Sequence, residues 1–313
     1  MKHKMGDKLP GNANWMSRLP EELLDVPLWN LAIPGSHDSM SFCLDTSSPV
    51  VESESWFLKV MDRLAPCCTR PCVLRWATTQ QTVLSSQCEL GVRFLDMRIA
   101  KKPKECSKLF FAHGIYTWIT VKEALDELAA WLDAHPKEIV IICCSHFSCL
   151  SLSDHTQFVD YIISLFGPKL CSSQDCATLR SCWSRHQQII VSYDNQDMVN
   201  NHPQLWTDIP YWYADSTDPK KVIAYLEAQK HAGRPSCFFV SGLNLTETVP
   251  FVLLHPFENM RKITTKALTV LLGWVREQQP GPEVDGVNII CCDFVGASNF
   301  CDCVIRLNYK GRC

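Results

Sequence analysis

The chain has 313 residues, of which 46% are hydrophobic, and its 30 basic and 33 acidic side chains leave a net charge of -3. Such a balanced charge gives no electrostatic support for nucleic-acid binding. No run of about 18 apolar residues offers a transmembrane helix. The polar segment 1–24 lacks the apolar stretch of a signal peptide, so we expect a cytoplasmic protein with a single folded domain over residues 25–313.

Eighteen cysteines give the chain the appearance of a disulfide-linked protein, and several stand in adjacent pairs: Cys67-Cys68, Cys143-Cys144 and Cys291-Cys292. The last two pairs interrupt apolar runs, where neighbouring side chains on a strand point to opposite faces and cannot easily serve one site. Without a secretory signal, disulfides are not expected. No C-x-x-C pair is matched by a second one, as zinc sites require. We therefore expect reduced cysteines in the core and on the surface.

Eight segments have the composition of buried strands. Most are dense in valine, isoleucine and phenylalanine and show little alternation of polar and apolar residues. This pattern is typical of strands covered on both faces in a parallel sheet. In chain order the segments span residues 29–33, 92–100, 109–113, 138–144, 188–193, 211–214, 236–242 and 287–294.

Helical patterns lie between these segments. The clearest, residues 120–136, has Thr120 and Glu123 in the spacing of a capping box and closes at Pro136. Residues 218–233 and 266–281 repeat the pattern. Strands alternating with helices predict an α/β fold. Eight such strands suit a single closed (β/α)8 TIM-type barrel, with an open doubly wound sheet as the alternative. Residues 45–75 are irregular, and we expect a helix there over one mouth of the barrel.

Polar side chains gather where the predicted strands end, which is where barrel enzymes carry their chemistry. Asp96 and Arg98 are two residues apart on the second strand, so their side chains share a face. Closure of the barrel brings the eighth strand beside the first, so Asp293 can reach His37. The residues at these ends are His37, Asp38, Asp96, Arg98, His113, His146 and Asp293.

Each of these residues alone has an ordinary structural explanation, such as a turn histidine or an ion pair between Asp96 and Arg98. Together they place histidines, carboxylates and a guanidinium at one mouth, where buried polar groups would all need partners. Two imidazoles can move the protons of phosphoryl transfer while an arginine neutralises the phosphoryl charge. Calcium requires several oxygen ligands. Arg98 stands where a second such ligand would be, so we expect no metal and no other cofactor.

Four stretches, "LAIPGSHDSM", "GVRFLDMRI", "FAHG" and "VNIICCDFVGA", occur in this order across nearly the whole chain. Their sequence and spacing resemble the X domain of phosphatidylinositol-specific phospholipases C, most closely the small eukaryotic X-domain proteins. The resemblance implies an irregular (β/α)8 barrel. It also implies cleavage of phosphatidylinositol to diacylglycerol and an inositol phosphate, through a 1,2-cyclic phosphate.

The resemblance assigns roles to the strand-end residues. His37 matches the general base that activates the inositol 2-hydroxyl, and Asp293 matches the carboxylate that orients this base. His113 matches the general acid for the diacylglycerol oxygen, helped by Asp38. Arg98 matches an arginine that binds the phosphate.

Other positions separate the chain from parts of the family. Asp96 matches an acidic residue of the bacterial enzymes, and Asp38 and Arg98 follow their metal-independent pattern instead of the asparagine and acid of the calcium-dependent enzymes. The lysine and arginine with which the bacterial enzymes hold inositol are not found. His146 and Tyr193 are the candidates in their place, and together with Asp96 they are the expected substrate-binding residues.

A phospholipase meets its substrate at a membrane, and aromatic residues near the strand ends are candidates for this contact. They are Tyr116, Trp118 and Trp212, with packing inside the barrel as the alternative. The nearly neutral charge predicts a transient, peripheral contact with a phosphoinositide-containing membrane. Two other functions remain open: a phosphoinositide-binding or regulatory module with weak or no turnover, and a phosphodiesterase for another lipid or glycerol phosphodiester.

Overall fold

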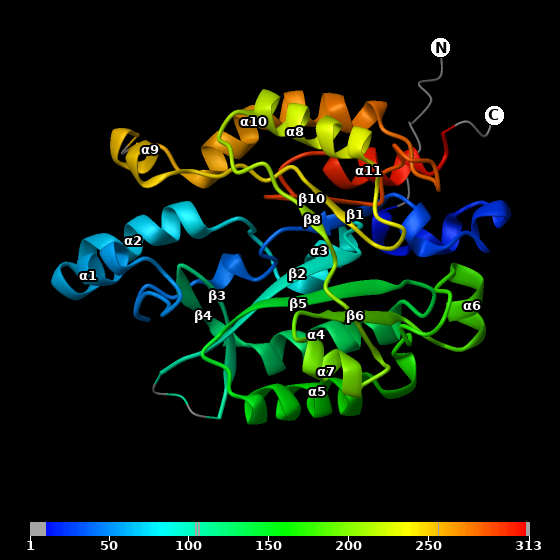
Figure 1. The fold of residues 1–313 in the computed structure, drawn as a ribbon, viewed down its shortest axis with the longest axis horizontal. Coiled ribbons are helices and arrows are strands. Elements are labelled where there is room, and N and C mark those ends of the chain that lie inside the picture. Colours follow the sequence, from blue (N-terminus) through cyan, green and yellow to red (C-terminus); the bar gives the residue numbers. More distant parts are fainter. Residues whose placement is uncertain (1–10, 104, 106, 256, 311–313) are drawn as a thin grey trace, which may run out of the picture.

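The computed structural model describes residues 11–103, 105, 107–255 and 257–310. Eight parallel strands form one curled sheet in the order β7-β6-β5-β2-β1-β10-β9-β8, with helices packed around it (Figure 1). The first and last strands are neighbours, as a barrel requires, and the predicted α/β barrel-like fold is confirmed. The strands are β1 (Ile33–Ser36), β2 (Phe94–Lys101), β5 (Val140–Ser148), β6 (Ile189–Tyr193), β7 (Leu205–Trp206), β8 (Tyr211–Trp212), β9 (Val240–Gly242) and β10 (Ile289–Cys292).

The sheet is open between β7 and β8, which corrects the expectation of a closed ring. Among the described residues, no hydrogen-bonded pairing joins these two strands. Each has only two residues, and residues 207–210 are all that connects them. This connection is too short for the crossover helix of a parallel unit. β7 was not predicted, because residues 205–206 do not belong to a longer apolar run, whereas β8 lies within the predicted segment 211–214.

Strand β1 lies further along the chain than its pattern indicated. Leu28–Asn30 form a 3-10 turn, and Pro34 and Gly35 pair with β10 inside the strand instead of ending it. A Cβ atom on Gly35 would lie 3.0 Å from Phe94 and 3.1 Å from Ile289. The glycine therefore allows three strands to pack closely at this point of the barrel wall.

The third predicted strand exists, but it is not one of the parallel barrel strands. β3 (Leu109–His113) pairs antiparallel with β2 and with β4 (Ile115–Thr120), a strand that was not predicted. Only Gly114, with a φ of 73°, connects β3 to β4. So short a connection can join only antiparallel strands, because parallel neighbours need a crossover. The hairpin still carries His113 to the mouth of the barrel.

Helices occupy most connections between the parallel strands. In α4 (Val121–Ala134) the predicted capping box is confirmed: the Thr120 hydroxyl accepts the Glu123 N–H, and the Glu123 carboxylate accepts the Thr120 N–H. The patterns at 218–233 and 266–281 correspond to α8 and to most of α10. The other helices are α3 (Leu84–Glu89), α5 (Leu152–Phe166), α6 (Leu179–Ser184), α7 (Gln196–Asn201), α8 (Pro219–Ala232), α10 (Met260–Glu277) and α11 (Phe300–Leu307).

Three helices project from one side of the molecule, on the left in Figure 1: α1 (Trp56–Leu64), α2 (Pro66–Ala77) and α9 (Val249–Leu254). The first two arise from the segment where a helix over the mouth was expected. They pack through Leu58 and Val73 onto a small apolar cluster that includes Ile115. α2 also contacts α9, because the rings of Trp76 and Phe251 meet edge to face with centroids 6.0 Å apart.

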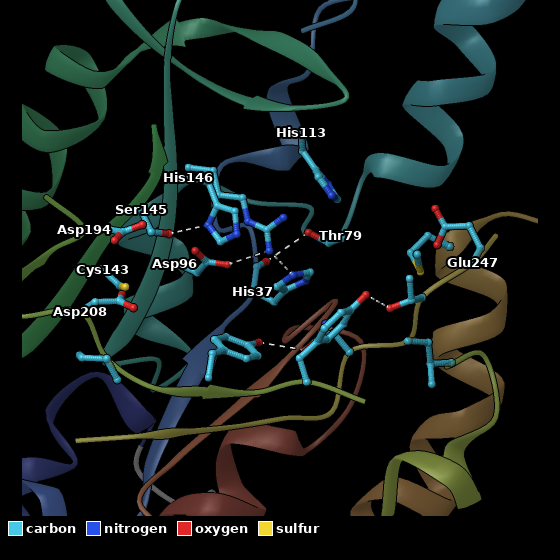
Figure 2. A pocket seen from close by; sticks show the side chains of 18 residues that line it. His37, Thr79, Asp96, His113, Cys143, Ser145, His146, Asp194, Asp208 and Glu247 are labelled. Carbon is cyan, nitrogen blue, oxygen red and sulfur yellow. Dashed lines mark hydrogen bonds and ion pairs between the residues drawn. The ribbon is translucent and has the colours of Figure 1, made fainter. Parts of the chain in front are cut away.

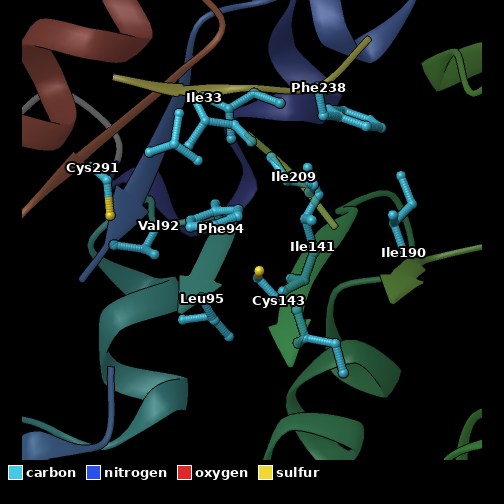
Figure 3. Packing of buried hydrophobic residues seen from close by; sticks show 14 of the residues in the cluster. Ile33, Val92, Phe94, Leu95, Ile141, Cys143, Ile190, Ile209, Phe238 and Cys291 are labelled. Carbon is cyan, nitrogen blue, oxygen red and sulfur yellow. The ribbon is translucent and has the colours of Figure 1, made fainter. Parts of the chain in front are cut away.

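The hydrophobic core fills the barrel and the layer between the sheet and its helices. Ile33, Phe94 and Ile141, from three neighbouring strands, belong to it (Figure 3). The adjacent cysteines of β5 and β10 are buried free thiols in this core, as predicted. Within the described ranges, no helix has the length and apolar character needed to cross a membrane.

Residues 11–24 fold onto the bottom of the barrel, the end at which the parallel strands begin. Trp15 and Met16 are buried in the core. The Glu138 carboxylate accepts the backbone N–H groups of Met16 and Ser17. It also lies 2.6 Å from Nη2 of Arg93, and both side chains of this ion pair are fully buried. The ion pair therefore fastens the N-terminal segment to the starts of β2 and β5.

Candidate active site

The register between β1 and β10 places the first histidine. Ser36 and Cys292 are paired at the ends of these parallel strands, so the next residues, His37 and Asp293, emerge side by side. His37 Nδ1 lies 2.7 Å from Asp293 Oδ1, and both side chains are buried. The two residues predicted to meet across the chain therefore do so at the mouth of the barrel.

Arg98 contacts three of the strand-end residues at once. Its Nε lies 2.7 Å from Asp38 Oδ1. Its Nη2 lies 2.8 Å from His37 Nε2 and 3.4 Å from Asp96 Oδ2. A guanidinium can only donate, so His37 Nε2 accepts and the ring proton is on Nδ1, which donates to Asp293. This tautomer leaves Nε2 as the basic nitrogen that faces Arg98.

His113 approaches from the hairpin of β3 and β4. Its Nδ1 lies 2.7 Å from the carbonyl oxygen of Ala77, at the end of α2, and 3.2 Å from Asp38 Oδ2. Asp38 Oδ2 is also 3.4 Å from His37 Nε2, and the centroids of the two imidazoles are 6.2 Å apart. Asp38 thus lies between both histidines, in a turn where its φ is 40°.

The two histidines have opposite pKa shifts. Burial disfavours the imidazolium form of His37, but the carboxylates of Asp38 and Asp293 outweigh it and raise the pKa above its usual value. Burial lowers the pKa of His113, and Asp38 offsets only part of this effect. Burial also opposes ionisation of Asp38, yet Arg98 and the histidines hold its pKa below the usual range. Environments that separate the pKa values of neighbouring groups are typical of acid–base sites.

A cavity of about 490 Å³ opens over these residues, and Figure 2 shows side chains from several strand ends converging on it. Four carboxylates line it: Asp96, Asp194, Asp208 and Glu247. Burial raises the pKa of Asp208, and it raises the pKa of Glu247 to about 7. Among the described residues that line the cavity, Arg98 is the only lysine or arginine. The cavity therefore combines four acidic side chains and three histidines with one fixed cation.

Of the three predicted substrate-binding residues, Asp96 lines the cavity, and the other two have different positions. His146 lines the cavity (Figure 2), where its Nδ1 lies 2.8 Å from the Ser145 hydroxyl. Tyr193 does not line the cavity, so its expected role is corrected. Alternation along β6 turns Tyr193 outward, where its hydroxyl lies 2.8 Å from Nδ1 of His155 on α5. The next residue, Asp194, lines the cavity instead.

Several residues of the site were not predicted. The Tyr211 ring centroid lies 6.3 Å from that of His37, and the Tyr211 hydroxyl donates to Asn244 Oδ1 at 2.9 Å. The Thr79 hydroxyl and the Gln80 amide donate to the His37 carbonyl at 3.1 and 3.0 Å. Tyr211 belongs to the predicted strand 211–214, but the sequence did not show which side chains of that strand point into the barrel. Thr79 and Gln80 come from a loop after α2 that has no recognisable pattern.

One group of ligand-type side chains could in principle hold a cation. One ligand atom each from His37, Asp38 and Asp96 lie within 4.8 Å of one another. The guanidinium of Arg98 already contacts all three side chains. The arrangement therefore fits a fixed organic cation, and a metal ion would have to displace Arg98 from its partners.

Two of the three aromatic residues expected at the membrane are buried, which corrects that prediction. Tyr116 has 0% exposure because it lies on β4, not in a loop, and packs with Phe110. Trp212 is 7% exposed and packs on Phe239, with ring centroids 4.7 Å apart. Trp118 alone of the three is exposed, at 62%.

A larger exposed apolar surface lies on α1. We call it the α1 apolar surface, and it consists of Trp56, Phe57, Met61 and Leu64. Trp56 and Leu64 are each 77% exposed. α1 leads directly into α2, whose last residue contacts His113 through its carbonyl. The sequence patterns did not reveal this surface, because its residues fall in the irregular segment 45–75.

Comparison with known proteins identifies the family. No protein-family model matches the chain. The chain is 47% identical over 298 residues to the PI-PLC X domain-containing protein 1 of Danio rerio, which covers 94% of this chain and 96% of that protein. It is 45% identical over 300 residues to the human protein of the same name, with coverage of 96% and 93%. The chain belongs to the PI-PLC X domain-containing protein family.

Other family members and solved structures agree. The chain is 38% identical over 309 residues to the PI-PLC X domain-containing protein 3 of Danio rerio. A phosphatidylinositol-specific phospholipase C from Listeria monocytogenes superposes with a TM-score of 0.64 at 18% identity, over 95% of this chain and 99% of that one. The corresponding protein from Staphylococcus aureus gives 0.63 at 15% identity, over 94% and 97%. At these identities, the comparison with the two solved structures shows that this chain shares their fold.

Proposed function

We propose that this protein is a phosphodiesterase of the phospholipase C type, which cleaves phosphatidylinositol to diacylglycerol and an inositol phosphate. The observation that carries the proposal is the placement of His37 and His113 on either side of Asp38, which Arg98 also contacts, in the lining of a cavity. Family membership and the fold shared with bacterial enzymes of that name support it.

In the first step, His37 Nε2 takes the proton of the inositol 2-hydroxyl, and that oxygen attacks the phosphorus. Without substrate, Arg98 donates a hydrogen bond to Nε2. When a phosphate oxygen accepts this hydrogen bond instead, Nε2 becomes free to act as the base. The bond from phosphorus to the glycerol oxygen breaks, and His113 protonates the leaving oxygen from Nε2. Arg98 neutralises the charge that develops on the phosphoryl oxygens. The product is a 1,2-cyclic phosphate, which water opens with the proton transfers reversed.

The charges of the cavity indicate which headgroup it accepts. Four acidic side chains line the cavity together with a single guanidinium, and carboxyl oxygens accept hydrogen bonds from hydroxyl groups. Those that are ionised repel phosphate groups beyond the one that Arg98 binds. The proposed substrate is therefore phosphatidylinositol whose ring hydroxyls are not phosphorylated.

The proposed membrane contact is the α1 apolar surface in place of Tyr116 and Trp212. Its exposed aromatic and aliphatic side chains suit insertion at the level of the lipid headgroups. Helix α9, whose last residue Leu254 is exposed, lies on the same side of the molecule as α1 (Figure 1). Contact there would bring the end of α2, and with it the cavity, toward the lipid.

The test is release of inositol phosphate from phosphatidylinositol vesicles by the purified full chain, with chelator present. We expect activity in the wild type and a loss of about a hundredfold or more in His37→Ala and in His113→Ala. A matched control is His186→Asn, since His186 is exposed and remote from the cavity, with a φ of 56° that asparagine also tolerates. Full activity in either catalytic variant would contradict the roles assigned, and loss of wild-type activity with chelator would contradict metal independence.

A second function, binding without turnover, is favoured by one observation. Arg98 is already engaged by three side chains, and among the described residues that line the cavity there is no second lysine or arginine to bind the phosphate in its place. In that case wild type and His113→Ala would bind phosphatidylinositol vesicles equally, and neither would form product.

A further inference from the structure

Two adjacent cysteines stand at the start of α2, directly after the α1 apolar surface. Cys67 and Cys68 are exposed, and Cys72, one turn further along, is half-buried. The adjacent cysteines of β5 and β10, in contrast, are buried. Neither Cys67 nor Cys68 takes part in the chemistry proposed above. They are therefore free thiols on a surface that also exposes large apolar groups.

The surroundings of this cysteine pair are both apolar and basic. Leu64, three residues before Cys67, is 77% exposed. Residues 56–77 contain four basic residues and one acidic residue, although the whole chain has a net charge of -3. The single acid, Asp62, lies 2.6 Å from Nε of Arg70. Exposed apolar side chains beside basic ones are attracted to a bilayer that contains anionic lipid.

The two helices are fixed with this surface outward. The ion pair of Asp62 and Arg70 joins α1 to α2, and Asp62 Oδ2 also accepts the backbone N–H of Val50 at 3.2 Å. The inner faces, with Leu58 and Val73, pack onto the apolar cluster beneath. The α1 apolar surface and the cysteine pair thus remain on the exposed side of one rigid unit.

We propose that Cys67 and Cys68 are sites of S-acylation by long-chain fatty acids, donated by acyl-coenzyme A. The cysteine thiolate attacks the carbonyl carbon of the donor thioester. A carbon–sulfur bond to the cysteine forms, and the bond to coenzyme A breaks. Coenzyme A leaves as a thiol with the proton that the cysteine gave up, so no oxidant or reductant is needed.

A pair of thiols suits a lasting anchor. One acyl chain gives only marginal membrane binding, and a second signal is needed to hold a protein there. The second cysteine supplies another chain, and the α1 apolar surface supplies further contact. Cysteines beside membranes or on amphipathic helices are typical S-acylation sites.

Other uses of the pair fit the structure less well. The two Sγ atoms lie 4.0 Å apart, whereas a disulfide requires about 2.05 Å. Successive side chains on a helix diverge by about 100°, which opposes closing that bond. Among the described residues, the group with metal-ligand spacing is at the barrel mouth and not here.

Acylation here would fix the position of the catalytic cavity, and this consequence rests on the proposed function. α2 has 12 residues, so it is about 18 Å long. It begins at the cysteine pair and ends at Ala77, which contacts His113. An anchor at one end of α2 would therefore hold the site at the lipid surface.

The test is metabolic labelling of the full chain in cultured eukaryotic cells with an alkyne analogue of palmitate. We expect hydroxylamine-sensitive label in the wild type and at least a fivefold loss in Cys67→Ser/Cys68→Ser. The matched control, Cys176→Ser/Cys237→Ser, removes two exposed cysteines elsewhere and should keep the label. Hydroxylamine treatment of wild-type membranes should also release the protein, which tests the anchor without any substitution.

Each outcome decides the question. Absence of label in the wild type, or equal label in Cys67→Ser/Cys68→Ser and wild type, would overturn the inference. Thermal melting of the variant checks that it folds. The S-acylation proposal and the proposed enzymatic activity are tested separately by assaying unacylated protein, produced in bacteria, on dissolved short-chain phosphatidylinositol. If the protein is labelled in cells but does not hydrolyse this substrate, S-acylation is supported and the proposed activity is contradicted.

Discussion

At the scale of single residues, the site separates two neighbours in the chain. His37 and Asp38 are adjacent, yet His37 takes its orienting carboxylate from Asp293. Asp38 bonds to Arg98 and lies between the two imidazoles. The proposed base has a raised pKa and the proposed acid a lowered one. In the free protein, therefore, only a small fraction of the molecules has a neutral His37 and a protonated His113 at the same time.

This arrangement predicts a shift in the pH profile of Asp293→Asn. Activity requires neutral His37 and protonated His113 together. Because the pKa of His37 is the higher of the two, kcat/KM rises with pH up to the pKa of His113 and falls again above the pKa of His37, which Asp293 helps to raise. Removing that charge should move the alkaline limb of kcat/KM to lower pH and reduce the maximum by about a hundredfold or more. The acidic limb should stay in place, because burial dominates the lowered pKa of His113 and Asp293 is not among its causes. An unmoved alkaline limb would exclude His37 as the base.

At the scale of elements, exposure makes the α1 apolar surface a stronger candidate for membrane contact than Tyr116 or Trp212. A loop would expose Tyr116, but the one-residue turn at Gly114 folds residues 115–120 back as β4. Trp56 and Phe57, in contrast, begin a helix whose other face is packed against the protein. Exposure in the folded chain, not aromatic content, decides which residues can reach lipid.

Trp56→Ala/Phe57→Ala should weaken binding to vesicles that contain anionic lipid by about tenfold or more, since burying each large apolar side chain contributes about 1.5–3 kcal/mol. Hydrolysis of dissolved short-chain substrate should not change, because neither residue lines the cavity. Cosedimentation with vesicles measures the binding. Trp118→Ala is the matched control, since Trp118 is also exposed but lies on β4. A larger effect from Trp118→Ala would place the membrane contact on the hairpin.

The elements also show what could be predicted from sequence and what could not. The strand ends that carry His37, Arg98 and Asp293 were found because they depend on local pattern and on the rule that parallel strands end together. Tyr193 was misplaced because a one-residue step along a strand reverses the face of a side chain. Contacts from the loop after α2, such as that of Gln80, depend on the folded path of the chain and have no local signal.

At the scale of the whole molecule, the two ends of the barrel have different roles. The carboxyl ends of the strands hold the cavity, as barrel enzymes generally arrange their chemistry. At the opposite end, Arg93 and Glu138 precede β2 and β5 and form a buried ion pair. Glu138 also binds the backbone at Met16 and Ser17. This end should therefore govern stability without touching the chemistry.

Glu138→Gln should lower the free energy of unfolding by about 3–5 kcal/mol, because it leaves the guanidinium of Arg93 buried without a counter-charge. Urea denaturation measures the loss, and activity per folded molecule should remain at the wild-type level. The matched control is Asp126→Asn, which removes the exposed partner of Lys122 on α4 and should cost about 0.5 kcal/mol or less. If both variants unfold at the same urea concentration, the buried pair does not fasten the barrel. If Glu138→Gln instead loses activity while its stability is unchanged, the two ends of the barrel are coupled.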